Sequence, residues 1–254
     1  MIKDKKVIIF DIDGTLIDSI GIWNEIDREL IKRIGNGKIG DTDIAKQRDE
    51  KLKHYSKCED AYLEYCKFLK EKYGSNMEIA EIKKLRYEIA NNYLRKSIDY
   101  KPNAEIVLKY LKQKGFILAI ASTTNEHTIE IYENENENII NKANIKDIFS
   151  LIYSKDTVKE LKPNPEIYYK ILKELNVDKK ECLIIEDSLI GVEAANNADI
   201  EVAVIYDKYS DCNREEINKL SQYRFKDYNE MLNYIKNELE DNWWKKLIKL
   251  HYYI

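Results

Sequence analysis

The 254-residue sequence contains few of the residues that mark several common classes of protein. Its four cysteines, Cys58, Cys66, Cys182 and Cys212, show no CxxC spacing, and its three histidines are scattered. A disulfide-stapled secreted fold and a zinc site both need such residues at close and regular spacing. The sparse cysteines therefore indicate free thiols in a reducing compartment and argue against a zinc protein.

Long apolar segments and an excess of one charge are also missing. No stretch approaches the roughly 20 apolar residues of a membrane-spanning helix. Residues 1–6 lead into an apolar run without the hydrophobic segment of a signal peptide. The chain has 42 basic and 46 acidic residues, for a net charge of −4, whereas nucleic-acid binders normally have a basic excess. We therefore predict a cytoplasmic protein with no membrane span and no nucleic-acid partner.

The most informative segment is Asp11-Ile12-Asp13-Gly14-Thr15, which follows the apolar run Val7-Ile8-Ile9-Phe10. Such a run indicates a buried strand that carries the two acids to its C-terminal end. Two carboxylates this close repel each other unless a cation or a shared proton lies between them. The pattern favours a metal-assisted site. The alternative is a polar exit from the strand, because Asp, Gly and Thr are ordinary turn residues.

Three later segments place further polar groups in a similar way. Ser122 follows the apolar run 116–121, Lys162 precedes a helix that opens with Pro165, and Glu186-Asp187 ends the apolar run 182–185. Ligands of an open parallel sheet bind outside the carboxyl ends of its strands. We therefore expect these groups to converge with Asp11 and Asp13.

Together the four segments resemble the motifs of the haloacid dehalogenase (HAD) superfamily, in its phosphatase and phosphomutase branch with an inserted helical cap. The matching motifs are Asp11-x-Asp13-Gly14-Thr15, Ser122, Lys162-Pro163-x-Pro165 and Glu186-Asp187-Ser188-x-x-Gly191. The resemblance covers residues from about 7 to 205. It implies an α/β fold with a Rossmann-like three-layer core, a mostly parallel five-stranded sheet and an all-helical cap.

The hydrophobic pattern along the chain predicts where the core and the cap lie. Five strand-like runs lie at 7–10, 116–121, 148–153, 182–186 and 201–205. Helical patterns alternate with them, which predicts a parallel sheet with right-handed crossovers. No strand signal appears between about residues 18 and 99. We therefore expect a discontinuous core of residues 1–17 and 100–240, interrupted by a helical cap at 18–99.

Residues 241–254 form an unusual tail, rich in Trp, Tyr and Lys. A helix docked on the core is the favoured interpretation. Two alternatives stay open: a basic amphipathic helix on a membrane surface, and a contact within a homodimer.

The resemblance also implies roles for individual residues. Asp11 is expected to attack phosphorus and form an aspartyl-phosphate, while Asp13 protonates the leaving oxygen and later deprotonates water. Lys162 supplies positive charge beside them. Ser122 is expected to bind the phosphate, and the start of the helix near Thr123 and Asn125 would add an anion site. Mg²⁺ is implied as cofactor, with this ligand set: Asp11, Asp13 through its backbone carbonyl, Asp187, and Glu186 less directly, through water.

The resulting functional prediction is a Mg²⁺-dependent phosphatase of a small phosphorylated metabolite. One alternative is a sugar phosphomutase similar to β-phosphoglucomutase, and another is a catalytically quiet interaction module of the same fold. The mutase group carries an arginine in a short glycine-containing cap segment. Gly40 and Arg48 do not stand in that context, which favours the hydrolase.

Overall fold

The computed structural model describes residues 1–35, 44–55, 58 and 60–251, with the backbone alone at 49, 53 and 241–251. The chain divides into two compact units. Met1–Asp18 and Asp99–Ile254 form the first, called the core unit, and Ser19–Ile98 form the second, called the helical unit. Within the described residues, no helix has the length and apolar character to span a membrane. The cytoplasmic location stays a prediction.

A parallel sheet of six strands lies at the centre of the core unit, in the order β3-β2-β1-β4-β5-β6. The strands are β1 (Val7–Phe10), β2 (Ile117–Ala121), β3 (Leu151–Tyr153), β4 (Cys182–Glu186), β5 (Glu201–Ile205) and β6 (Tyr223–Phe225). Every residue of β1 and β4 is buried, as expected of central strands covered on both faces.

The prediction of a parallel α/β sheet is confirmed, but the predicted number of five strands is wrong. The sixth strand, β6, is a three-residue edge strand that pairs with β5. Its sequence is Tyr223-Arg224-Phe225, so no apolar run of the kind that marks the other strands announces it. The predicted strand at 148–153 also begins later, because a short helix, α8 (Ile145–Ile148), occupies its first residue.

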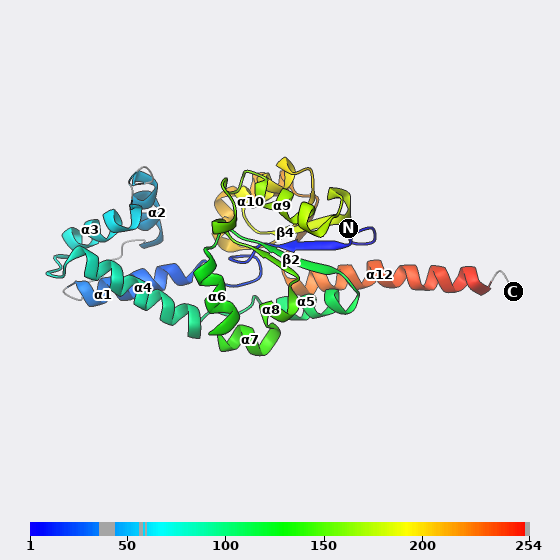
Figure 1. The fold of residues 1–254 in the computed structure, drawn as a ribbon, viewed down its shortest axis with the longest axis horizontal. Helices are drawn as coiled ribbons and strands as arrows, with labels where there is room; N and C mark the ends of the chain where they lie inside the picture. The colour runs from blue at the N-terminus through cyan, green and yellow to red at the C-terminus, as the bar shows by residue number, and fades with distance from the viewer. Residues whose placement is uncertain (36–43, 56–57, 59, 252–254) are drawn as a thin grey trace. The chain divides into compact units, whose positions relative to one another are not determined.

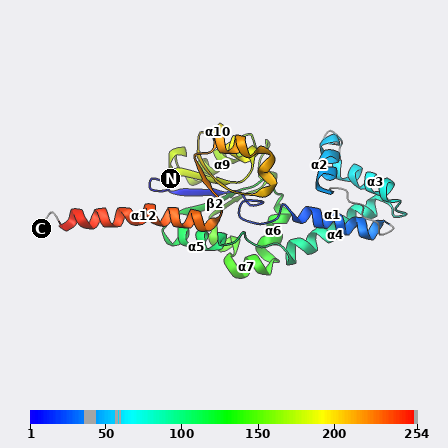
Figure 2. The same cartoon turned by 180° about the vertical axis from the view of Figure 1, so that it is seen from behind.

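Helices cover both faces of this sheet, which completes the three layers (Figure 1 and Figure 2). α9 (Glu166–Leu175) and α10 (Leu189–Asn197) lie on one face, and α5 (Ala104–Gln113) and α12 (Tyr228–His251) on the other. The remaining elements of the core unit are α6 (Glu126–Asn134), α7 (Glu137–Ala143), α8, α11 (Arg214–Leu220), and the short 3₁₀ turns η1 (Lys155–Thr157), η2 (Lys179–Glu181) and η3 (Lys208–Asn213).

The predicted tail at 241–254 continues α12, which runs without a break from Tyr228 to His251. Side chains from residue 241 onward lie outside the described part of the structure. The docked, membrane-surface and dimer interpretations of the tail therefore stay predictions.

The chain leaves the core unit and returns to it at neighbouring points. The backbone N–H of Asp18 donates to the carbonyl of Asp99 at 3.1 Å, and Ile17 and Tyr100 form an antiparallel bridge. The helical unit is thus inserted through two adjacent backbone segments just beyond β1, and the pairing of the sheet continues undisturbed.

In its described residues, the helical unit contains α1 (Ile22–Ile34), α2 (Ile44–His54), α3 (Ala61–Tyr73) and α4 (Ile79–Lys96). Residues 36–43, between α1 and α2, lie outside the described residues. Apolar side chains of all four helices form its core, among them Ile26, Leu30, Ile44, Leu69 and Ile82. Its role as a cap over the site stays a prediction.

A buried ion pair joins α1 to α4 inside this core. Arg86 Nε donates to Asp27 Oδ1 at 2.8 Å, and both side chains are almost fully buried. The Arg86 guanidinium also lies 5.4 Å from the Trp23 ring and 4.9 Å from the Tyr62 ring. Removing one partner of a buried ion pair leaves the other charge buried and uncompensated, which strongly destabilises the folded state.

Replacing Asp27 with Leu is therefore expected to destabilise the helical unit by about 3–5 kcal/mol. Amide hydrogen exchange of α1 and α4 measures this loss locally. Glu25→Ala is the matched control on α1, because it removes an exposed ion pair with Arg28 and is expected to cost about 0.5 kcal/mol or less. Equal protection in the two variants would contradict a structural role for the buried pair.

Candidate active site

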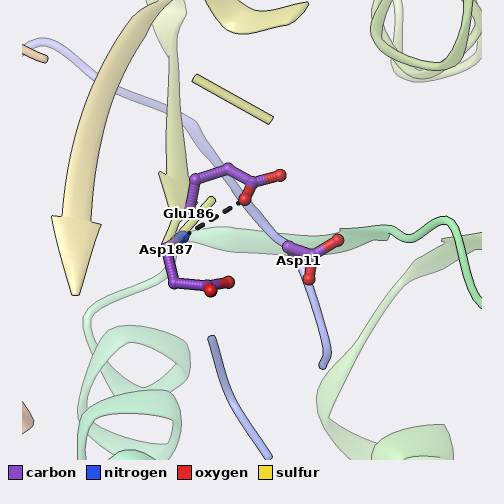
Figure 3. Close-up of side chains that lie close together, drawn as sticks. All are labelled: Asp11, Glu186 and Asp187. Carbon is purple, nitrogen blue, oxygen red and sulfur yellow. Dashed lines mark hydrogen bonds between the residues drawn. The ribbon is translucent and has the colours of Figure 1, made fainter. Parts of the chain in front are cut away.

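Acidic side chains gather at the carboxyl ends of two neighbouring strands, as the sequence predicts. Asp11 follows β1, Glu186 is the last residue of β4, and Asp187 follows it. Each offers one carboxylate oxygen, and these oxygens lie within 4.8 Å of one another. Figure 3 shows the three side chains, with the hydrogen bond from the Asp187 backbone to Glu186. All three are buried, at 8% exposure or less.

Lys162 brings a positive charge to this cluster, and its role in charge stabilisation during catalysis stays a prediction. Its ammonium donates to Asp11 Oδ1 at 2.8 Å, to Glu186 Oε1 at 2.5 Å and to the carbonyl of Ala121 at 2.8 Å. The ring of Tyr168, on the first turn of α9, lies 5.6 Å from the nitrogen. The lysine thus bridges two of the three carboxylates and ties them to the end of β2.

Burial and crowding perturb the charges of the cluster. Burial raises the pKa of Asp11 well above its usual value, and the charges of Glu186 and Asp187 add to this against the opposing effect of Lys162. Burial and the charge of Glu186 raise the pKa of Asp187 to about 7. Burial also disfavours the Lys162 ammonium, but Asp11 and Glu186 outweigh it and raise the pKa of Lys162. Three carboxylates close to a single ammonium leave an excess of negative charge, which favours the binding of a further cation.

Glu186 is held in place by the start of α10. Its Oε2 accepts from the backbone N–H of Asp187 at 3.2 Å and from Ser188 Oγ at 3.2 Å. A Cβ at Gly191 would lie 2.0 Å from this carboxyl group, so only glycine leaves room for it. Glu186 is therefore engaged with Lys162 and α10, and its part in metal binding stays a prediction.

Asp187 has two hydroxyl partners, one on each oxygen. Thr15 Oγ1 donates to Oδ1 at 2.8 Å, and Ser210 Oγ, from η3, donates to Oδ2 at 3.2 Å. Gly14 has a φ of +83°, and a Cβ there would lie 2.7 Å from Asp187 Oδ2. Gly14 and Thr15 belong to the predicted motif around Asp11 and Asp13. The contact of Ser210 was not predicted, because no spacing in the sequence connects Ser210 to Asp187.

Asp13 is directed to different partners. Its carboxylate accepts hydrogen bonds from the hydroxyl of Thr124 and, at 3.1 Å, from the hydroxyl of Tyr132. Neither contact was anticipated, although Thr124 stands two residues after Ser122. The predicted role of the Asp13 carbonyl in metal binding stays a prediction.

The predicted phosphate-binding residues occupy the junction between β2 and α6. Ser122 Oγ accepts from the backbone N–H of Thr124 at 3.1 Å, and Ser122 is 1% exposed. Asn125 Oδ1 accepts from the N–H of Thr128 at 2.8 Å, so this oxygen caps α6. Thr123 is half-buried. Phosphate contacts by Ser122, Thr123 and Asn125 stay predictions.

Comparison with known proteins places the chain among hydrolases. The model of the haloacid dehalogenase-like hydrolase family matches residues 8–205. A bifunctional riboflavin kinase/FMN phosphatase of Arabidopsis thaliana is 29% identical over 205 residues, which cover 80% of this chain and 49% of that protein. A phosphoglycolate phosphatase of Aquifex aeolicus is 30% identical over 202 residues, which cover 78% of this chain and 84% of that protein.

A solved structure has the same fold. It is that of a Thermotoga maritima protein provisionally named a β-phosphoglucomutase, with a TM-score of 0.74 and 24% identity, over 91% of this chain and 99% of that one. The α/β core with strand-end acids and the family match define a hydrolase. The chain belongs to the haloacid dehalogenase-like hydrolase family. The alternative of a catalytically quiet interaction module is thereby disfavoured.

The close approach of α10 to Glu186 makes a testable prediction about Gly191. Gly→Ala inside a helix usually stabilises it by about 1 kcal/mol. Here we expect Gly191→Ala to destabilise the protein by about 1–3 kcal/mol, the usual cost of overpacking, because the new methyl group displaces the Glu186 carboxyl. Urea unfolding measures the change. Glu193→Ala, on the same helix, is the control and should shift stability by about 0.5 kcal/mol at most. A stabilised Gly191→Ala would refute the contact.

Proposed function

We propose that this protein is a Mg²⁺-dependent phosphatase that hydrolyses a small phosphorylated metabolite through an aspartyl-phosphate on Asp11. The observation that carries the proposal is the Lys162 ammonium, 2.8 Å from Asp11 Oδ1, within a buried cluster of acids at the strand ends. Two relatives whose names include phosphatase activities, on FMN and on phosphoglycolate, support the reaction class. They leave the substrate of this chain open.

In the proposed reaction, a carboxylate oxygen of Asp11 attacks phosphorus, and the bond from phosphorus to the leaving oxygen breaks. Asp13 gives its proton to that oxygen. Water then attacks the phosphorus of the aspartyl-phosphate, Asp13 takes a proton from it, and inorganic phosphate and free Asp11 are released. The covalent route divides one difficult displacement into two easier ones, and a single acid–base group serves both. Lys162 orients Asp11 and offsets the charge of the phosphoryl group.

The acid cluster fits a divalent cation. Its donors are oxygens, which Mg²⁺ prefers. Burial, and after it the neighbouring negative charges, raise the pKa of Asp11 and the pKa of Asp187, with one ammonium beside the cluster. We propose Asp11, the Asp13 carbonyl and Asp187 as ligands, with Glu186 holding Lys162 and contributing less directly. When bound, the ion would neutralise negative charge of the substrate phosphate.

The phosphomutase alternative gains no support from the helical unit. Gly40 lies outside the described residues, and Arg48 donates to Asn24 at 2.9 Å and lies 3.6 Å from the buried Asp27. Hydrolysis is therefore the proposed outcome, and assays for isomerised sugar phosphates distinguish the two.

A panel of phosphorylated metabolites, assayed for phosphate release with Mg²⁺, tests the proposal. We expect release from at least one compound and none above background with Asp11→Asn, because the amide cannot act as the nucleophile. Asp147→Asn makes the same chemical change on an exposed residue of α8 and should retain full activity.

If folded wild-type protein releases no phosphate from the panel, or if Asp11→Asn retains activity, the phosphatase proposal is wrong. An isomerised product that depends on an added sugar bisphosphate would indicate the mutase instead.

Mg²⁺ binding is tested separately, by calorimetric titration without substrate. Loss of an outer-shell partner typically weakens metal binding about 10–100-fold. Asp187→Asn, which removes a proposed ligand, should weaken it by at least this factor, and Thr15→Val, which removes a hydrogen bond to Asp187, by about 10-fold. Asp147→Asn again serves as control. Unchanged affinity in Asp187→Asn would place the ion elsewhere.

A further inference from the structure

The carboxylate of Asp13 receives a hydroxyl hydrogen bond on each of its oxygens. The Thr124 hydroxyl donates to Oδ2, and the Tyr132 hydroxyl donates to Oδ1 at 3.1 Å. Asp13 itself is half-buried and follows β1, whereas its two partners come from beyond the end of β2. Two donors from separate points of the chain restrict both rotatable bonds of the aspartate side chain.

The geometry of α6 explains how Tyr132 reaches a strand end. α6 begins directly after the Asn125 cap, and Tyr132 lies two turns further on. Long helical side chains point back towards the N-terminus of their helix. The Tyr132 side chain is 1% exposed, so packing holds its ring, and its hydroxyl is delivered to the start of α6, where Asp13 lies.

This arrangement keeps Asp13 apart from the acid cluster. Lys162 attracts carboxylates and already holds Asp11 and Glu186. A fourth carboxylate turned towards it would add negative charge where three are already crowded. The oxygens of the described cluster belong to Asp11, Glu186 and Asp187, and Asp13 is not among them. The two hydroxyls therefore give Asp13 an alternative set of partners on the side of α6.

We propose that Tyr132, together with Thr124, is a positioning residue that fixes where Asp13 transfers its proton. This inference rests on the acid–base role of Asp13 in the proposed function. A general acid must lie within hydrogen-bond reach of the leaving oxygen, and a misplacement of about 1 Å can cost about 100-fold in rate. Neither hydroxyl touches the reacting atoms in this scheme. Each acts through Asp13.

The test compares two aryl phosphate substrates that differ by a para-nitro group, phenyl phosphate and p-nitrophenyl phosphate. Phenol has a pKa of about 10, like a tyrosine side chain, so its oxygen needs a proton as it leaves, whereas nitrophenolate leaves readily without one. Release of the phenol in the first turnover isolates the step in which Asp13 acts as an acid. We expect Tyr132→Phe to slow phenol release about 10-fold, because Asp13 loses one of its two restraints and the acid is less well placed, and to slow nitrophenol release far less.

The control variants distinguish a positioning role of Tyr132 from a role in folding alone. Tyr153→Phe removes a tyrosine hydroxyl that donates to Glu174 at 2.6 Å in an exposed contact, and should leave both rates unchanged. Thr124→Ser keeps the hydroxyl and should preserve the ratio of the two rates, while Thr124→Val should shift it as Tyr132→Phe does. A purely structural role for Tyr132 would lower both rates equally, and this result would overturn the proposal.

A crystal structure of Tyr132→Phe tests the same claim without any substrate. We expect the Asp13 carboxylate to leave its position beside Thr124. An unmoved Asp13 would overturn the positioning role, even if the wild-type protein is a phosphatase. Conversely, wild-type protein that releases phosphate from neither these esters nor the metabolite panel would overturn the phosphatase proposal itself, and the inference with it.

Discussion

The ammonium of Lys162 is the interaction on which the site depends. Three carboxylates with oxygens within 4.8 Å of one another could not stay buried and charged without compensation. Lys162 donates to two of them and to the carbonyl that ends β2, so it also joins the loop before α9 to the sheet. Because Lys162 lies just before α9, the charge balance of the site depends on how α9 packs against the sheet.

Two glycines leave room for the acid side chains around Lys162. Gly14 and Gly191 lie where any side chain would collide with Asp187 or Glu186. Hydroxyl groups from Thr15 and Ser210 occupy the outer sides of Asp187. Glu186 and Asp187 thus have hydrogen-bond partners that take no part in the proposed reaction, whereas Asp11 is oriented by Lys162, which does take part.

Much of this architecture could be predicted from the sequence, because the central strands are unbroken apolar runs and Asp11, Lys162 and Asp187 stand at their ends or in marked motifs. The edge strand β6 was missed, since Arg224 interrupts its apolar residues and no apolar run marks it. The contacts of Tyr132 and Ser210 were missed for another reason. They depend on how α6 and η3 pack on the sheet, and no local pattern carries that information.

The point of insertion of the helical unit has a consequence for the modularity of the chain. Asp18 and Asp99 are joined by a hydrogen bond across the two connecting segments, and Ile17 pairs with Tyr100 beside them. Because entry and exit are adjacent, a loop of a few residues could close the gap, or a different module could be grafted there, without altering strand order. The helical unit and the core unit could then diversify as separable parts of one polypeptide.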